Sequence, residues 1–562
     1  MAKVDGGVLI SRILKEQNVK YLFAVNGGHL FPILANIRDD GIKLIHMRHE
    51  QTTAYAADAY ARVSGNTGVC AVTAGCGLTN AVTGLCTAAL TNSSVVCLSG
   101  QHPTTEDDIG SFQEAYGSEV VGSFAKYTKR VLDWSTIEVD LRQAFRAAKN
   151  APQGVAMVEI PLNILYQEEE ETQQRPGAKV YDNDDLRSQG DPRGIEKAVE
   201  LLLNAERPLI AGGDGIFWSD AGAELAELAE LTQTPVYCRR AGQGALDEAH
   251  PLAIRGAWKK PFTGEADVVL AVGFRFWSGE KFGQPPTWTD KATYIQVDSD
   301  PQRVGWHVPA EVGIVGDPKL VLRQLIDAIR ARNTDSASRA TSPWLKKMAE
   351  VRKNYDQSIE QRAAETHDTM PIHPDRLVRD LVSVIDDDAT LVVDSFTLSG
   401  YTSNWFTAHT MGQIVDAGPL APVGHGIGMG IGVQLARPGK QVIVVSGDGG
   451  LGIGAMDLET AAKYELPIVL LLWNNSSWGP DFASMPMLKG RTDPFDMIPD
   501  IRYDKVFEPM GLHTEHVETP DQIIPALERA LASGKTSLIN VVGDKRYGHP
   551  SLGGNLLGSS SV

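Results

Sequence analysis

Short runs rich in valine, isoleucine and leucine alternate with longer amphipathic segments along most of this 562-residue chain. Examples are GVCAVTA at 68–74, SVVCLSG at 94–100 and QVIVVSGDGG at 441–450. Such alternation is typical of βαβ units, in which apolar strands of a parallel sheet are covered by helices on both faces. The sequence therefore predicts an α/β protein built from doubly wound parallel sheets.

The alternation occurs in three blocks, and a chain of this length is too long for one hydrophobic core. We therefore predict three domains, each with its own sheet. Between them lie polar segments that we expect to be linkers, and after the last one comes a Gly/Ser-rich segment that is either a tail or a lid. The predicted domains span 1–167, 190–335 and 371–545, the linkers 168–189 (solvated, by its acidic run) and 336–370, and the tail 546–562.

Composition excludes several functional classes. The formal net charge of -18 argues against nucleic acid as a partner, because such binding depends on clustered positive charge. No apolar run reaches the roughly 18 residues that would span a bilayer, so we expect no membrane partner and a cytoplasmic protein. The five cysteines form no C-x-x-C pair and predict reduced, mostly buried thiols: Cys70, Cys76, Cys86, Cys97 and Cys238.

Polar residues follow two consecutive strands of the third block. Asp448 comes after the run QVIVVSG, and Asn475 comes after the run IVLLLWN. Carboxyl ends of parallel strands are where doubly wound sheets bind ligands. A carboxylate oxygen, an amide oxygen and the carbonyl of Ser477 would suit Mg²⁺ and leave positions for diphosphate oxygens. The glycines around Asp448 would let backbone N–H groups approach phosphates: Gly447, Gly449 and Gly450.

Gly-Asp-Gly alone is common in ordinary turns, so the alternative is a βα turn with a capping aspartate. The added Asn-Asn in a strand-turn-helix-strand context makes the segment resemble the thiamine-diphosphate motif. The resemblance then extends over almost the whole chain, to the superfamily of acetolactate synthases and 2-hydroxyacyl-CoA lyases. It implies a pyrimidine-binding domain, a central Rossmann-like domain, a diphosphate-binding domain and a homodimer or homotetramer.

The segment RHEQTTAYAADAYAR resembles the part of this family that carries the activating glutamate, here Glu50. A carboxylate bonded to ring nitrogen N1′ would favour the imino tautomer, whose nitrogen takes the C2 proton. The alternative is a solvated acid that the helix dipole favours at a helix start. DAGPLAPVGHGIGMGIG resembles the segment that bends the cofactor, with Val423 where the family usually has methionine and with the carbonyl of Ala421 accepting from the aminopyrimidine. A core role for Val423 is the alternative.

Two loops resemble parts of the family that surround the reacting carbon. VNGGHLFP contains His29, and GSFQEAYG contains Gln113, which the family places with a phenylalanine over the thiazolium. From the loop after the metal ligands, Trp478 and Asp481 are further candidates. A histidine or carboxylate could remove a substrate hydroxyl proton. Bystander or core roles are the alternatives for each of them.

The central block, with FGQPP followed by IQVD, resembles the 2-hydroxyacyl-CoA lyase and oxalyl-CoA decarboxylase branch. The resemblance implies ADP or CoA in this domain and places Arg275 and Asp298 near phosphate and adenosine groups. A surface salt bridge and a helix cap are the respective alternatives. Two positions depart from the branch by removing positive charge: Asp214 in GGDG, and Ala151 where an arginine is usual.

The function that the resemblance implies is cleavage of a 2-hydroxyacyl-CoA into an aldehyde or ketone and formyl-CoA, or the reverse carboligation. The main alternative is an acetolactate synthase-like carboligase or a decarboxylase of 2-oxoacids or of oxalyl-CoA. A catalytically idle regulatory subunit is a third possibility. The joint presence of Glu50, Asp448 and Asn475 argues against it.

Overall fold

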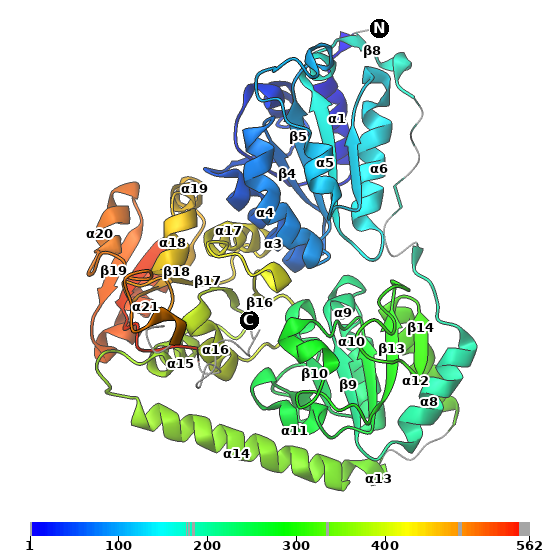
Figure 1. Cartoon of the computed structure of the whole chain (residues 1–562), viewed down its shortest axis with the longest axis vertical. Helices are drawn as coiled ribbons and strands as arrows, with labels where there is room; N and C mark the ends of the chain where they lie inside the picture. Colours follow the sequence, from blue (N-terminus) through cyan, green and yellow to red (C-terminus); the bar gives the residue numbers. More distant parts are fainter. Residues whose placement is uncertain are drawn as a thin grey trace. The chain divides into compact units, whose positions relative to one another are not determined.

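The computed structural model describes residues 3–549 except 176, 178–179, 182–185, 333–336 and 481–485. It contains three six-stranded sheets in which strands pair in parallel, with helices between successive strands (Figure 1). The predicted α/β class with three doubly wound sheets is confirmed. The domain boundaries given above stay a prediction.

The first sheet has the strand order β3-β2-β4-β5-β7-β6. Helices on one of its faces bury a large hydrophobic core that includes Leu9, Ile13, Leu98, Leu141 and Phe145. The strands are β2 (Tyr21–Ala24), β3 (Lys43–His46), β4 (Gly68–Val72), β5 (Val95–Gln101), β6 (Tyr127–Arg130) and β7 (Val155–Pro161). The main helices are α1 (Gly6–Glu16), α2 (Phe31–Asn36), α3 (Glu50–Ser64), α4 (Cys76–Leu90), α5 (Gly117–Gly122) and α6 (Ile137–Lys149).

The central sheet has the order β11-β10-β9-β12-β13-β14, with one core on each face. One core is aliphatic, and the other is built largely from aromatic rings such as Phe276 and Trp288. The strands are β9 (Pro208–Gly212), β10 (Val236–Cys238), β11 (Ala253–Ile254), β12 (Val268–Val272), β13 (Thr293–Asp298) and β14 (Val312–Val315). The main helices are α8 (Pro192–Asn204), α9 (Asp214–Trp218), α10 (Gly222–Thr232) and α12 (Pro318–Ala331).

The third sheet has the order β16-β15-β17-β18-β20-β19. Its core includes Leu377, Val445, Leu471 and Ile539. The strands are β15 (Thr390–Asp394), β16 (Ile414–Val415), β17 (Val442–Gly447), β18 (Ile468–Asn474), β19 (His513–Val517) and β20 (Ser537–Val542). The main helices are α15 (Pro374–Val384), α16 (Phe396–Trp405), α17 (Gly426–Ala436), α18 (Asp448–Gly454), α19 (Asp457–Lys463) and α21 (Ile523–Ala532).

Close contacts divide the chain into two compact units. The first unit contains residues 1–186, 420–442 and 450–468, and the second contains the remainder. Within the first unit, α17 packs against α3 (Figure 1), and their backbones come close together at two glycines. A Cβ added at Gly428 would lie 2.7 Å from Thr52 O, and one at Gly432 would lie 2.1 Å from Ala56 O. Only glycine permits this approach.

The predicted linkers contain regular structure. In the first, β8 (Glu169–Glu170) pairs antiparallel with β1 (Lys3–Val4). We expected the acidic start of this linker to be solvated, and that expectation is wrong for these two residues. The second contains the 23-residue helix α14 (Pro343–Glu365), whose first turn is capped by Ser342. Of the predicted tail, residues 550–562 lie outside the described part of the chain. In the described part, no helix combines the length and the apolar character needed to cross a membrane.

The described cysteines are all free: Cys70 and Cys97 are buried, Cys86 and Cys238 are half-buried, and Cys76 is exposed. The prediction of mostly buried thiols is therefore wrong for Cys76, because that residue begins α4 at the surface.

Candidate active site

Two neighbouring strand ends of the third sheet carry the predicted metal ligands. Asp448 is the first residue of α18 and directly follows β17, while Asn475 directly follows β18. Since β17 and β18 are adjacent in the sheet, both side chains lie at its carboxyl edge. Asp448, Asn475 and Ser477 are all buried. The fold thus brings together the three residues that we expected to supply oxygen ligands.

The polar atoms of this group are only partly paired. Asp448 Oδ1 accepts a hydrogen bond of 2.9 Å from Gly449 N, and Asn475 Oδ1 accepts one of 3.2 Å from Ser477 N. Asp448 Oδ2 and Ser477 Oγ are buried without a hydrogen-bond partner. Buried polar atoms are normally paired, so these two require an explanation.

A divalent cation would provide that explanation. Burial raises the pKa of Asp448 to about 6, because its carboxylate has left water with little compensation. A nearby cation would reverse that effect, and hard oxygen donors of this kind suit Mg²⁺. In the described residues no three His, Cys, Asp or Glu side chains gather as a metal site, so Asp448 would be the single acidic ligand. The residues fit the predicted metal and diphosphate.

The glycine turn and the loop after β18 are in contact. A Cβ at Gly449 would lie 2.8 Å from Cε3 of Trp478, so this glycine makes room for the indole ring. Trp478 is 45% exposed, which does not agree with a role as core. Asp481 lies outside the described residues.

Glu50 is the first residue of α3 and is buried rather than solvated. Its Oε2 accepts a hydrogen bond of 3.0 Å from Nδ2 of Asn80 on α4. On the other side, a Cβ at Gly77 would lie 3.5 Å from Glu50 Oε1. The alternative of a solvated acid therefore does not hold, and the carboxylate has a fixed orientation.

The segment before α17 presents the predicted wedge. Val423 is 42% exposed, so the alternative of a core valine does not hold either. Ala421 has φ 49°, in the left-handed region that few residues other than glycine adopt. Strained backbone of this kind is often found at functional sites.

His29 is buried in the short 3₁₀ helix at 28–30, where its Nδ1 lies 3.0 Å from Oγ1 of Thr73. A Cβ at Gly100 would lie 2.3 Å from the Cβ of His29, so glycine at this position leaves space for the histidine. Burial, and to a lesser degree the charge of His102, lowers the pKa of His29. A neutral imidazole can accept a proton.

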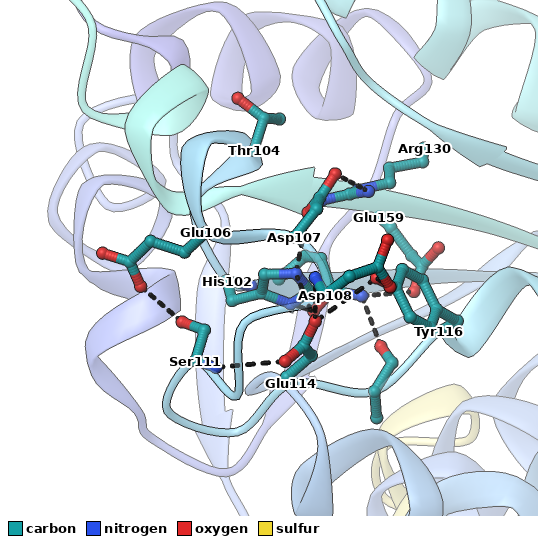
Figure 2. A network of polar contacts seen from close by, with 12 residues as sticks. His102, Thr104, Glu106, Asp107, Asp108, Ser111, Glu114, Tyr116, Arg130 and Glu159 are labelled. Atoms are coloured by element: carbon teal, nitrogen blue, oxygen red, sulfur yellow. Dashed lines mark hydrogen bonds and ion pairs between the residues drawn. The ribbon is translucent and has the colours of Figure 1, made fainter.

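Gln113 lies in an ordered loop between β5 and α5. Its Nε2 lies 3.3 Å from Cys76 Sγ, and its φ is 57°. A Cβ at Gly75 would lie 2.5 Å from Gln113 O, so the loop sits directly on the turn before α4. The neighbouring Phe112 is 77% exposed. Beneath this loop Figure 2 shows a dense network of polar contacts.

Arg275 and Asp298 lie at the carboxyl edge of the central sheet, after β12 and at the end of β13. Arg275 Nη2 lies 2.5 Å from Oδ2 of Asp214, and both side chains are largely buried. Arg275 therefore forms a salt bridge, as the alternative predicted, but the pair lies largely below the surface. Asp298 Oδ1 accepts from Asp300 N at 2.9 Å, and burial raises the pKa of Asp298.

Two supporting residues escaped the sequence analysis. Asn80 gives no signal in the sequence, because it sits in an ordinary amphipathic helix and meets Glu50 only through tertiary packing. His102 offered a usable signal: it follows the strand-like run SVVCLSGQ at a carboxyl end, where functional side chains gather.

Comparison with known proteins gives three matches to family models that follow one another along the chain. "Thiamine pyrophosphate enzyme, N-terminal TPP binding domain" matches residues 4–120. "Thiamine pyrophosphate enzyme, central domain" matches 195–325, and "Thiamine pyrophosphate enzyme, C-terminal TPP binding domain" matches 397–541.

Full-length relatives carry two kinds of name. A probable acetolactate synthase of Mycobacterium bovis is 32% identical over 553 residues, which cover 97% of each chain. A probable acetolactate synthase large subunit of Methanococcus aeolicus is 30% identical over 562 residues, covering 96% of this chain and 92% of the relative. A 2-hydroxyacyl-CoA lyase of Oryza sativa subsp. japonica is 29% identical over 565 residues, covering 98% and 97%.

Proposed function

Because the chain belongs to the family of thiamine pyrophosphate enzymes, we propose that it makes or breaks a carbon–carbon bond beside a carbonyl group, with a 2-hydroxyacyl-CoA as substrate. When bound, thiamine diphosphate supplies an acidic carbon that acts as a nucleophile toward carbonyl carbon. For lactoyl-CoA the products would be acetaldehyde and formyl-CoA, which together contain all atoms of the substrate.

In this proposal the residues divide the work. Asp448, Asn475 and the carbonyl of Ser477 hold Mg²⁺, which in turn binds the diphosphate. Glu50 holds N1′ of the aminopyrimidine through its carboxylate. His29, kept neutral by burial, takes the proton from the substrate hydroxyl.

The observation that supports a CoA thioester is a cluster of arginines at the carboxyl edge of the central sheet. The pKa of Arg303 is lowered, mainly by burial and next by the nearby positive charge of Arg275. Arg240 Cζ lies 3.9 Å over the ring of Trp277, and its Nε is buried without a partner. Guanidinium groups held this close favour an anion between them, and phosphate is the anion that matches their geometry.

A second candidate is an acetolactate synthase-like carboligase that uses free 2-oxoacids. The observation that favours it is the ion pair of 2.5 Å between Arg275 and Asp214. Arg303 and Arg240 also have acidic partners, Asp300 at 3.2 Å and Asp416 at 3.3 Å. Every arginine of the cluster is thus paired with a carboxylate, which weakens the attraction for a nucleotide phosphate. The relatives named acetolactate synthase point in the same direction.

One experiment separates the two candidates. The full-length enzyme, loaded with thiamine diphosphate and Mg²⁺, is given lactoyl-CoA, oxalyl-CoA or pyruvate in parallel. Formyl-CoA and acetaldehyde from lactoyl-CoA would support the lyase. Release of CO₂ and formation of acetolactate from pyruvate, with no change in lactoyl-CoA, would overturn it and leave the carboligase. Formyl-CoA and CO₂ from oxalyl-CoA alone would instead indicate a decarboxylase.

We also propose a homodimer or homotetramer, since the family resemblance assigns the glutamate and the diphosphate site of one centre to different subunits. Sedimentation velocity of the holoenzyme tests this, and a monomer that is fully active would contradict it.

A further inference from the structure

Beneath the loop that carries Phe112 and Gln113 lies a polar network centred on the buried side chain of His102, with partly exposed members such as Asp107 on the outside (Figure 2). His102 directly follows β5, and its side chain is fully buried. Carboxylates from the loop and from β7 surround it, together with Arg130 at the end of β6. Nothing in the proposed chemistry requires such a network, so its role lies elsewhere.

Both ring nitrogens of His102 face hydrogen-bond acceptors. Nδ1 lies 2.7 Å from Oε1 of Gln101, and Nε2 lies 2.8 Å from Oδ1 of Asp107. Oε1 of Glu114 is also on the Nε2 side, at 3.7 Å. A neutral imidazole carries one N–H and could satisfy only one of these two contacts.

The orientation of the Gln101 amide is fixed by its other partners. Its Nε2 donates to Ala115 O at 2.5 Å and to Glu159 Oε1 at 3.1 Å, while its Oε1 accepts from His102 N at 2.9 Å. A flipped amide would place oxygen against two acceptors and N–H against a donor. Oε1 therefore faces Nδ1, which must donate.

The state of Asp107 is fixed in the same way. Its two carboxylate oxygens accept from Arg130 Nη1 at 2.9 Å and from Nη2 at 2.5 Å. The Arg130 hydrogen bonds hold the pKa of Asp107 below its ordinary value. An ionised carboxylate can only accept, so Nε2 of His102 must donate as well.

The same network holds the loop in place. Glu114 accepts backbone N–H bonds from Asp108, Gly110 and Ser111 at 2.7, 2.9 and 3.0 Å, which close the loop on itself. The loop is tied to the sheet by His102 through Asp107, by Gln101 through Ala115, and by Ser118, whose hydroxyl donates to Glu159. Phe112 and Gln113 lie between these ties.

We propose that His102 is a positioning residue whose doubly protonated ring clamps the 107–116 loop to the sheet and so holds Phe112 and Gln113 for the reaction. This inference rests on the proposed role of that loop in the active site. The charged and titratable groups that face His102 are Asp107, Glu114 and Tyr116 from the loop, Glu159 from β7, Arg130 from β6 and His29 from the loop after β2.

Loss of either tie of His102 should loosen the loop. The loop is observed by hydrogen–deuterium exchange of peptides covering 103–116 in the holoenzyme. We expect these peptides to be protected in the wild type, because both ties hold the loop. In His102→Phe, which has no ring N–H, protection should be low.

Activity provides the second readout. In His102→Phe we expect kcat to fall roughly 10- to 100-fold, the range for one charge-assisted hydrogen bond, with affinity for thiamine diphosphate unchanged. His102→Gln keeps a donor that can reach Asp107 and should recover part of the loss. The matched control is His513→Phe, since His513 also pairs with a carboxylate, Glu515 at 2.9 Å, on the edge strand β19.

The protonation state is tested in the unmodified protein, so the proposal does not depend on the folding of a variant. Ring-¹⁵N-labelled histidine should give one resonance, absent in His102→Gln, with both nitrogens in the imidazolium range at pH 7. A neutral tautomer there would overturn the proposal. So would full activity and full loop protection in His102→Phe, provided that Gln113→Ala is impaired. If Gln113→Ala is itself fully active, the role of the loop in the proposed function fails instead.

Discussion

Asn80 donates a hydrogen bond to Glu50, with 3.0 Å between its Nδ2 and Glu50 Oε2. The helix that follows the activating acid in the sequence thus fixes the orientation of its carboxylate. Two contributions to cofactor activation can therefore be measured with different variants. One is the presence of the carboxylate, and the other is its orientation.

Asn80→Ala should slow exchange of the cofactor C2 proton by roughly 3- to 10-fold, because Asn80 orients the carboxylate but the carboxylate itself stays in place. Glu50→Gln should slow it by at least roughly 10²-fold, because the amide cannot favour the imino tautomer as a carboxylate does. Quenched-exchange NMR measures both. Thr79→Ala is the control, since its hydroxyl bonds only the Cys76 carbonyl. Equal rates in Asn80→Ala and wild type would contradict the orienting role.

Asp448 should destabilise the metal-free protein near neutral pH. Its folded pKa, about 6, is above the ordinary value of 3.8, so its contribution is most favourable below pH 4 and is lost as pH rises to 6. The rise of the Asp448 pKa from 3.8 to about 6 corresponds to about 3 kcal/mol in the free energy of unfolding. Asp448→Asn should therefore melt later than wild type at pH 7 without cofactor, and the difference should vanish at pH 4.

With Mg²⁺ and thiamine diphosphate the order should reverse, because only the wild type gains stability from binding. Differential scanning calorimetry with and without ligands gives both comparisons. A variant that gains as much from the ligands as wild type would remove Asp448 from the metal site.

The buried pair of Arg275 and Asp214 predicts an asymmetry between single and double variants. Arg275→Ala leaves a buried carboxylate without its partner, and we expect a loss of about 3 to 5 kcal/mol in the free energy of unfolding. Replacing both residues by leucine should recover most of it. Urea denaturation measures these changes, with Arg193→Ala, which breaks an exposed ion pair with Asp191, as a control that should change the free energy of unfolding little.

Gly428→Ala should destabilise the first unit, since the new methyl group would lie 2.7 Å from Thr52 O. We expect about 1 to 3 kcal/mol from the forced separation of α17 and α3. Gly256→Ala is the control, because no atom lies within 4 Å of the added Cβ. Equal melting temperatures of the two variants would show that the helices can separate at little cost.

The acid limb of the pH–rate profile should belong to His29. Burial lowers its pKa from the ordinary 6.5, so the neutral base persists into mildly acidic solution. As the pH falls through this lowered pKa, the His29 ring gains a proton and kcat/KM should decline. His29→Gln should lower the plateau and remove this limb. If the variant retains the same limb, another group is responsible.

The sequence predicted the parts of the fold and site that depend on local pattern. Asp448 and Asn475 could be predicted from the sequence, because each follows an apolar strand and parallel strands end at one edge of the sheet. Their roles remain predictions. The α/β class followed from the alternation of apolar runs and amphipathic segments in the same way.

What the sequence could not predict depends on partners distant along the chain. The Arg275–Asp214 pair joins residues 61 positions apart, and both had been interpreted singly, one as a phosphate ligand and one as a departure from the family. The ties of His102 to Gln101 and Asp107 are local, but the full burial of its side chain, which makes them significant, arises only in the folded chain. Burial of this kind is a property of the packed sheet.

The contact between α17 and α3 also has a mechanical meaning. Helices whose backbones touch through Gly428 and Gly432 cannot slide or tilt independently, because no side chain separates the backbones at these two positions. Glu50 begins one of these helices, and Val423 lies three residues before the other. The two helices should therefore move as one rigid body, so that fluctuations of the protein displace Glu50 and Val423 together and leave the distance between them unchanged.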